Sequence, residues 1–131
     1  MKIEVNNLQK SFEKGDLSVD VIKGVDFIIQ SGETVAITGP SGSGKTTLLK
    51  LLAGLLVPSD GNILVDGTDI HTLPPDKRIK YVGYLPSTGT VFTGTVMDNL
   101  TGFQPENAKD ALQMAELLGI DKAIAALPNG Y

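Results

Sequence analysis

The sequence contains no cysteine, and this absence excludes a disulfide framework, a thiolate zinc site and thiol catalysis. No long apolar run is present either, because the longest, residues 51–57, is far too short to cross a bilayer. Residues 1–5 lack the apolar core of a signal peptide. Acidic residues outnumber basic ones by 15 to 11, and the net charge of −4 argues against nucleic acid as a partner. These absences are compatible with a cytosolic chain.

What the sequence does contain is sufficient for one folded domain. Its 131 residues are 41% hydrophobic and only 5% aromatic. A chain of this length and composition can bury a sizeable core. We therefore expect a single domain.

A phosphate-binding pattern follows the first third of the chain. An apolar run at 35–37 precedes it like a buried strand, and residues 47–53 follow it like a helix. Because strand, loop and helix come in the required order, the sequence predicts a nucleotide site here and not an accidental glycine-rich turn. The pattern has the form G-x-x-x-x-G-K-[ST] and consists of Gly39, Pro40, Ser41, Gly42, Ser43, Gly44, Lys45 and Thr46.

Each residue type in this pattern has a physical reason. The three glycines permit backbone angles that let successive N–H groups point at phosphate oxygens. The helix that begins near Gly44 adds its positive end, where anions bind favourably. The Lys45 ammonium can reach the β- and γ-phosphates, the Thr46 hydroxyl suits Mg²⁺, and the Thr47 hydroxyl can serve the α-phosphate.

The rest of the chain reads as a mixed α/β protein. Alternating residues predict strands at 2–12 and 19–30, which would form an antiparallel layer ahead of the nucleotide loop. Shorter strands are predicted at 62–65 and 81–85. Apolar residues at helical spacing predict a helix within 105–118, between a starting proline and a stopping glycine.

With these elements in place, the chain resembles the nucleotide-binding domain of ATP-binding cassette (ABC) transporters over essentially its whole length. Its later part is most similar to the exporter branch, including bacterial exporters with fused membrane and ATPase segments. The resemblance is carried by Lys10-Ser11-Phe12, the stretch 21–27, Gly32-Glu33, the loop 39–47, the runs 51–55, 58–61 and 63–67, and the later segments 82–86, 91–100 and 127–131.

The resemblance implies a P-loop NTPase core with an N-terminal antiparallel β layer. The β layer would cover about residues 1–30, the P-loop strand and helix about 33–55, the Q-loop region about 81–95 and the start of a helical subdomain about 96–131. It also implies ATP and Mg²⁺ as cofactors, with Lys45 as a catalytic residue. The implied partners are a second nucleotide-binding domain and the transmembrane domain of an exporter, with the chain itself soluble and held at the cytoplasmic face of the inner membrane.

Three parts that such domains carry are absent from residues 1–131: the Leu-Ser-Gly-Gly-Gln signature, an apolar strand ending in Asp-Glu, and a switch histidine. We therefore expect the N-terminal part of such a domain, truncated before the signature and the Walker B strand, and binding without turnover. Asp66 follows an apolar run, but Gly67 stands where Glu is wanted, so a β-hairpin is expected there. His71 is expected to be a solvated side chain and not a switch.

Two further positions leave alternatives open. The family usually has glutamine at the place of Ser87. The serine is a weakened Mg²⁺ ligand acting through a water, or Thr88 shares the role, or both belong to a polar surface loop. Phe12 aligns with the aromatic residue that stacks on adenine, with Val21 packing beside it. The alternative is that Phe12 only covers the β layer.

Other functions compete with an exporter motor. A P-loop small-molecule kinase is one, but such kinases open within a few residues of the loop strand and carry arginine-rich lids. Here 38 residues precede Gly39, and Arg78 is the only arginine. A nucleotide-binding module without turnover is the other.

Overall fold

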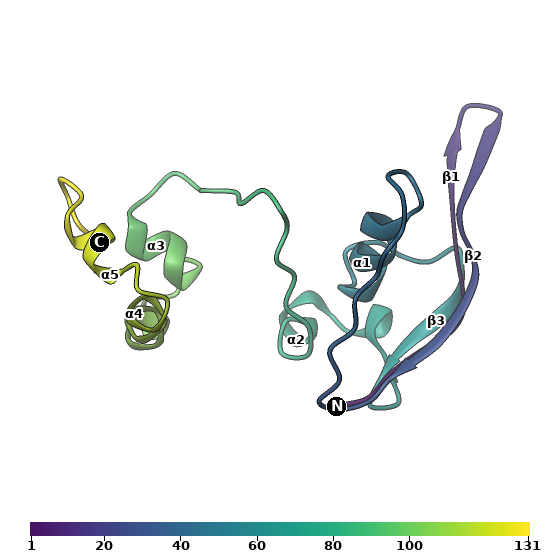
Figure 1. The fold of residues 1–131 in the computed structure, drawn as a ribbon, viewed down its shortest axis with the longest axis horizontal. Coiled ribbons are helices and arrows are strands. Elements are labelled where there is room, and N and C mark those ends of the chain that lie inside the picture. Colours follow the sequence, from purple (N-terminus) through teal and green to yellow (C-terminus); the bar gives the residue numbers. More distant parts are fainter. The chain divides into compact units, whose positions relative to one another are not determined.

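The computed structural model describes residues 1–131, which form two units, Met1–Leu85 and Pro86–Tyr131. The first unit contains an antiparallel sheet and the helix that follows the glycine-rich loop, and the second consists of short helices (Figure 1). None of the helices is both long and apolar enough to cross a membrane.

The first unit is built on a four-stranded antiparallel sheet with the order β2-β1-β3-β4. β1 (Ile3–Lys14) and β2 (Leu17–Ile29) form a long hairpin whose turn includes Gly15 at a φ of 63°. β3 (Asp60–Val65) pairs with the other side of β1, and β4 (Thr68–Asp69) closes the sheet. The predicted antiparallel layer is confirmed, and the ends of β1 and β2 differ from the predicted ones by at most two residues.

Asp66 lies in the tight turn between β3 and β4, so the predicted hairpin is confirmed. Asp66 and Gly67 have φ angles of 48° and 82°, and Val65 pairs with Thr68 across the turn. The Asp66 carboxylate accepts a hydrogen bond of 2.7 Å from the Lys2 backbone N–H. This acid therefore ties the turn to the start of β1.

The core of the first unit holds α1 (Lys45–Leu52) against the sheet. Leu51 is fully buried, and burial of a leucine side chain contributes about 1.5 to 3 kcal/mol. Because α1 begins at the end of the glycine-rich loop, this packing also fixes the loop's position. The buried cluster consists of Val5, Leu8, Ile22, Leu48, Leu51, Ile63, Val65 and Ile70.

Two predicted strands are not formed, at 35–37 and at 81–85. Both segments are apolar, but a strand exists only where its N–H and C=O groups pair with a neighbouring strand. Neither segment pairs with a strand of the sheet, whose four members are β1 to β4. Val35 is 52% exposed and Leu85 95% exposed, so these predictions were wrong because the apolar pattern does not reveal whether a partner strand is present.

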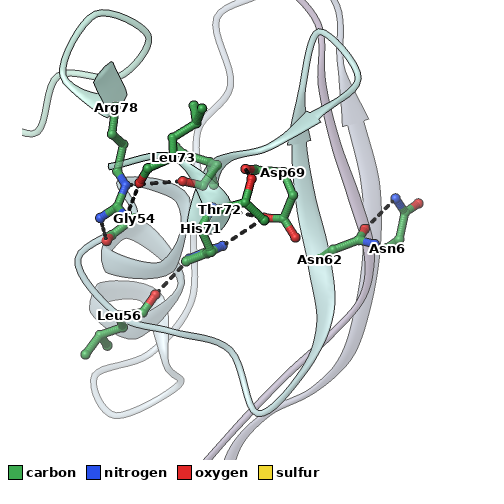
Figure 2. A network of polar contacts seen from close by, with 10 residues as sticks. Asn6, Gly54, Leu56, Asn62, Asp69, His71, Thr72, Leu73 and Arg78 are labelled. Atoms are coloured by element: carbon green, nitrogen blue, oxygen red, sulfur yellow. Dashed lines mark hydrogen bonds and ion pairs between the residues drawn. The ribbon is translucent and has the colours of Figure 1, made fainter. Parts of the chain in front are cut away.

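Arg78 binds the segment that follows α1 (Figure 2). It lies at the end of α2 (Pro75–Arg78), and its guanidinium donates to three backbone oxygens. Nη1 donates to Gly54 just after α1, Nε to Ile70 at 3.2 Å and Nη2 to Leu73 at 2.9 Å. One side chain thus joins three segments, because the fork of N–H groups can serve several acceptors at once.

The His71 side chain is almost fully buried, so the expectation of a solvated side chain was wrong. It belongs to the short 3₁₀ helix η1 (Ile70–Thr72), and its side chain is only 9% exposed. Its Nε2 lies 2.8 Å from the Leu56 carbonyl oxygen, and its Nδ1 lies 3.4 Å from Asp69 Oδ1 (Figure 2). The imidazole therefore packs against the segment that follows α1.

The second unit is helical, as the sequence predicts for the last third of the chain. Its elements are α3 (Val96–Thr101), the 3₁₀ helix η2 (Pro105–Asn107), α4 (Ala108–Leu117) and α5 (Asp121–Ala125). A proline opens η2, and a positive-φ glycine follows α4. Ala115 is the buried residue of α4.

Candidate functional site

The glycine-rich loop turns sharply from residue 39 into α1. Gly39, Gly42 and Gly44 have φ angles of 155°, 80° and 92°, which side chains rarely adopt. Gly44 also packs against β2, where an added Cβ would come within 3.1 Å of Val21 Cγ1. At this position glycine is thus required both by the backbone angle and by the close approach to the sheet.

The first turn of α1 offers backbone donors. Gly44 is the N-cap and no side chain caps the helix, while the first bond of the helix runs from the Leu48 N–H to the Gly44 carbonyl at 2.9 Å. The N–H groups of Lys45, Thr46 and Thr47 therefore have no acceptor within the helix. Together with the positive end of the helix, these donors favour an anion.

The Lys45 ammonium lies over the loop that precedes it. It donates to the carbonyl oxygens of Gly39 and Pro40, the latter at 2.8 Å, and to Ser43 Oγ at 3.4 Å. These contacts hold the positive charge against the loop. Phosphate oxygens are stronger acceptors for an ammonium than neutral carbonyls, so an anion can compete for this charge.

A pocket of about 430 Å³ opens over the loop and the start of α1. This volume lies within the range of small-ligand sites. None of its lining residues is acidic, and one is a lysine, so its chemistry suits an anion with several oxygens. It is lined by Val21, Ser41, Gly42, Gly44, Lys45, Thr46 and Thr47.

The same pocket fits a magnesium ion that arrives with phosphates. Mg²⁺ prefers oxygen ligands and is usually bound by one or two protein groups together with phosphates and waters. Thr46 supplies a hydroxyl in the lining, while no group of three or more His, Cys, Asp or Glu residues could hold a metal by itself. Ser87, the second predicted ligand, belongs to the other unit and lies exposed in an irregular segment, so its role stays a prediction.

Phe12 lies on β1 and is not part of the buried core. Its ring is 41% exposed, and Val19 of β2 is its register partner. Val21 lines the pocket whereas Phe12 does not. The stacking role of Phe12 therefore stays a prediction.

The structure places a charged residue beside Phe12 that was not predicted from the sequence. Lys10 Nζ lies 5.2 Å from the centroid of the Phe12 ring. The sequence could have indicated this contact, because residues two apart on a strand point to the same face. It was overlooked because a single lysine on a strand is usually only solvated.

Comparisons with known proteins agree with this geometry. Residues 22–129 match the family model described as ABC transporter. The chain is 42% identical over 111 residues to the mycobactin import ATP-binding/permease protein IrtB of Mycolicibacterium thermoresistibile, which covers 84% of this chain and 19% of that protein. The chain thus spans about a fifth of the length of that curated relative.

Two solved structures share the fold. One is a dimeric ATP-binding cassette in a post-hydrolysis state bound to ADP and Pi, with a TM-score of 0.78 and 26% identity over 98% of this chain and 62% of that one. The other is a bacterial ABC exporter with ATP bound, with a TM-score of 0.83 and 28% identity over 99% of this chain and 22% of that one.

Proposed function

The chain belongs to the ABC transporter family, and from this premise we propose that it binds ATP with Mg²⁺ at residues 39–47. The observation that carries the proposal is the pocket over the loop and the start of α1, which is lined by Lys45, Thr46 and Thr47, whose N–H groups have no acceptor within the helix. The solved relatives bound to ADP and Pi and to ATP support a nucleotide as that anion.

Each residue of the loop has a role in this proposal. The glycines and the exposed Ser41 and Ser43 present backbone N–H donors to the phosphates, whereas Pro40, which has no N–H, only shapes the turn of the loop. The Lys45 ammonium moves from the loop carbonyls to the β- and γ-phosphates. Thr46 holds Mg²⁺, which would neutralise phosphate charge when bound, and the Thr47 hydroxyl contacts the α-phosphate. Phe12 stacks on the base, with Val21 beside it.

We further propose that the chain is the N-terminal part of a motor domain of the exporter type, which couples ATP binding and hydrolysis to transport. The likeness to an ATP-bound exporter supports this, and the relative IrtB is an ATP-binding/permease protein. The dimeric cassette supports a second nucleotide-binding domain as a partner. A transmembrane partner would hold the chain at the cytoplasmic face of the membrane.

Hydrolysis is not proposed for residues 1–131 alone. A P-loop enzyme needs a group that orients the attacking water and charges that stabilise the transition state. Asp66, the acid that follows an apolar strand, is engaged by the Lys2 backbone N–H in the β3–β4 turn. Membership of the family removes the small-molecule kinase as an alternative, while binding without turnover describes what we expect of this chain.

Replacing the lysine of the loop tests the binding site. Lys45→Ala removes a charge-assisted contact worth about 1.5 to 3 kcal/mol, so ATP affinity should fall by roughly tenfold to more than a hundredfold in titration calorimetry with Mg²⁺. Lys50→Ala is the matched control, because Lys50 lies near the far end of the same helix. Equal ATP affinity for Lys45→Ala and the unaltered chain would refute the assignment.

A further inference from the structure

Lys10 is fixed between two features of the first unit. Its ammonium donates to the Val57 carbonyl oxygen at 2.8 Å and lies 5.2 Å from the centroid of the Phe12 ring. Val57 follows α1, whereas Lys10 and Phe12 lie on β1. The lysine therefore bridges the strand that carries the aromatic ring and the segment that leaves the nucleotide helix.

The ammonium occupies one face of the Phe12 ring. A cation over an aromatic face is attracted by the negative charge of that face, and the attraction persists at partly exposed sites. Lys10 itself is half-buried, and its hydrogen bond to a backbone carbonyl restricts where the ammonium can lie. Phe12 is 41% exposed, so part of the residue is open to solvent. A planar ligand that stacked on the ring would have to use the face that the ammonium does not occupy.

We propose that Lys10 is a positioning residue for the nucleotide base: it holds the Phe12 ring from one face so that the base stacks on the other. The inference rests on the proposed function, because it requires that Phe12 stacks on the base. It also goes beyond that function, because it assigns the recognition of the base to a cation–ring pair rather than to the ring alone. Lys10 acts through Phe12 and needs no contact with the nucleotide.

Removal of the ammonium should weaken the binding of ligands that have a base. In titrations with Mg²⁺, Lys10→Met should lower ATP affinity by about two- to fivefold, the effect of an exposed cation–ring contact. The affinity for inorganic triphosphate should change no more than in the control. Lys10→Arg keeps a cation that can lie over the ring and should restore ATP affinity.

Lys14→Met is the matched control, because Lys14 lies on the same strand and makes no side-chain hydrogen bond or ion pair. Although Lys14 is two residues from Phe12, Lys10 is the cation that lies over the ring, so Lys14→Met removes the same charge and leaves the cation–ring contact in place. A loss of affinity that Lys10→Met and Lys14→Met share reflects the general attraction between the protein's positive charge and the ligand's negative charge. The same holds for a loss of affinity that is equal for ATP and triphosphate. Only a loss in Lys10→Met that is specific to ATP supports the proposal.

A fluorescence measurement gives a second readout that does not depend on affinity. The chain has no tryptophan, so Phe12→Trp introduces a single tryptophan at the ring position, and excitation above the absorption of the three tyrosines isolates its emission. Adding Lys10→Met to this variant should change the tryptophan emission before any nucleotide is added, while adding Lys14→Met should leave it unchanged. Unchanged emission in both would overturn the proposal even if Lys10→Met bound ATP poorly because it folded poorly.

The failure of this inference differs from the failure of the proposed function. If Phe12→Ala weakens ATP binding but Lys10→Met does not, the base stacks on the ring and Lys10 has no part in positioning it. If Phe12→Ala leaves ATP affinity unchanged, or the unaltered chain binds no ATP, the proposed function of Phe12 or of the loop is refuted and the inference falls with it.

Discussion

Replacement of Phe12 tests whether recognition of the base is separate from recognition of the phosphates. Phe12→Ala should cost about 1 to 3 kcal/mol in ATP binding, the usual range for stacking of a base on an aromatic side chain. The affinity for inorganic triphosphate should stay nearly constant, because the loop supplies the phosphate contacts. Titration calorimetry with both ligands measures the difference.

Val19→Ala is the matched control for Phe12, because Val19 is the register partner of Phe12 on β2 and is itself 58% exposed. If Phe12 only covers the β layer, trimming either residue should act on both ligands alike. Equal losses of ATP and triphosphate in Phe12→Ala would therefore show that the ring supports the fold and not the base.

The spacing of glycine, lysine and threonine predicts the glycine-rich turn and the helix that follows it, because the phosphate-binding pattern places these residues at fixed positions. His71 could not be predicted in this way. Its imidazole lies against the Leu56 carbonyl, which is 15 residues earlier in the chain and is close only in the folded arrangement. An isolated histidine in a polar stretch carries no local signal of such a contact.

The start of α3 is held by a reciprocal pair, Thr95 and Asp98. The Asp98 N–H donates to Thr95 Oγ1 at 3.0 Å, and the Thr95 N–H donates to Asp98 Oδ2 at 2.8 Å. Two hydrogen bonds hold the pKa of Asp98 below its ordinary value of 3.8. The bond with the Thr95 backbone has the larger effect, and the bond with the Thr95 side chain has the smaller one. A spacing of Thr and Asp three residues apart is a recognised helix-start signal, and it went unused in predicting this short helix.

This capping pair predicts a pH dependence. Because the folded pKa of Asp98 is lowered, its stabilising effect on α3 is complete above the unfolded pKa and is lost as the pH falls through the folded pKa. NMR titration should give Asp98 a pKa below 3.8 in the folded chain and an ordinary value in urea. Thr95→Ala should raise the pKa of Asp98 only part of the way, since its backbone N–H still donates.

Thr93→Ala is the control for the capping pair, because Thr93 precedes the helix and makes no side-chain hydrogen bond to Asp98. It should leave the pKa of Asp98 in place. An Asp98 pKa that is the same in the folded and the urea-unfolded chain would contradict the account of this cap.

Whether an apolar segment becomes a strand is decided by its neighbours. The strands β1, β2 and β3 were predictable because their alternating residues place one side on a core that the chain itself supplies. The run at 35–37 has strand-like residues but no strand of the sheet beside it, and the segment 81–85 is in the same position. Sequence pattern predicts which residues are suited to a sheet, but it does not reveal which strands are available to pair.

Residues 1–131 by themselves should bind ATP and not hydrolyse it measurably. Residues 1–131 contain no Asp-Glu pair after an apolar strand, no signature sequence and no histidine other than His71, which packs against Leu56. Removal of one water-orienting or charge-stabilising group from a P-loop enzyme can cost about 10³ to 10⁵ in rate, so the absence of several should leave background turnover. A phosphate-release assay on purified monomeric chain measures this.

The same assay on Lys45→Ala provides the control. Both proteins should release phosphate at the rate of the buffer. Steady turnover in the unaltered chain that disappeared in Lys45→Ala would show that residues within 1–131 supply the catalytic groups, and Asp66 would be the first to examine.

The most direct test of the central claim is to locate the nucleotide on the chain. In amide proton–nitrogen NMR spectra, addition of ATP with Mg²⁺ should produce saturable shifts that are largest for Gly42, Gly44, Lys45, Thr46 and Thr47, whose N–H groups line the loop and the start of α1. Inorganic triphosphate should shift the same signals. Saturable shifts confined to other residues, with the signals of the loop unchanged, would contradict the account.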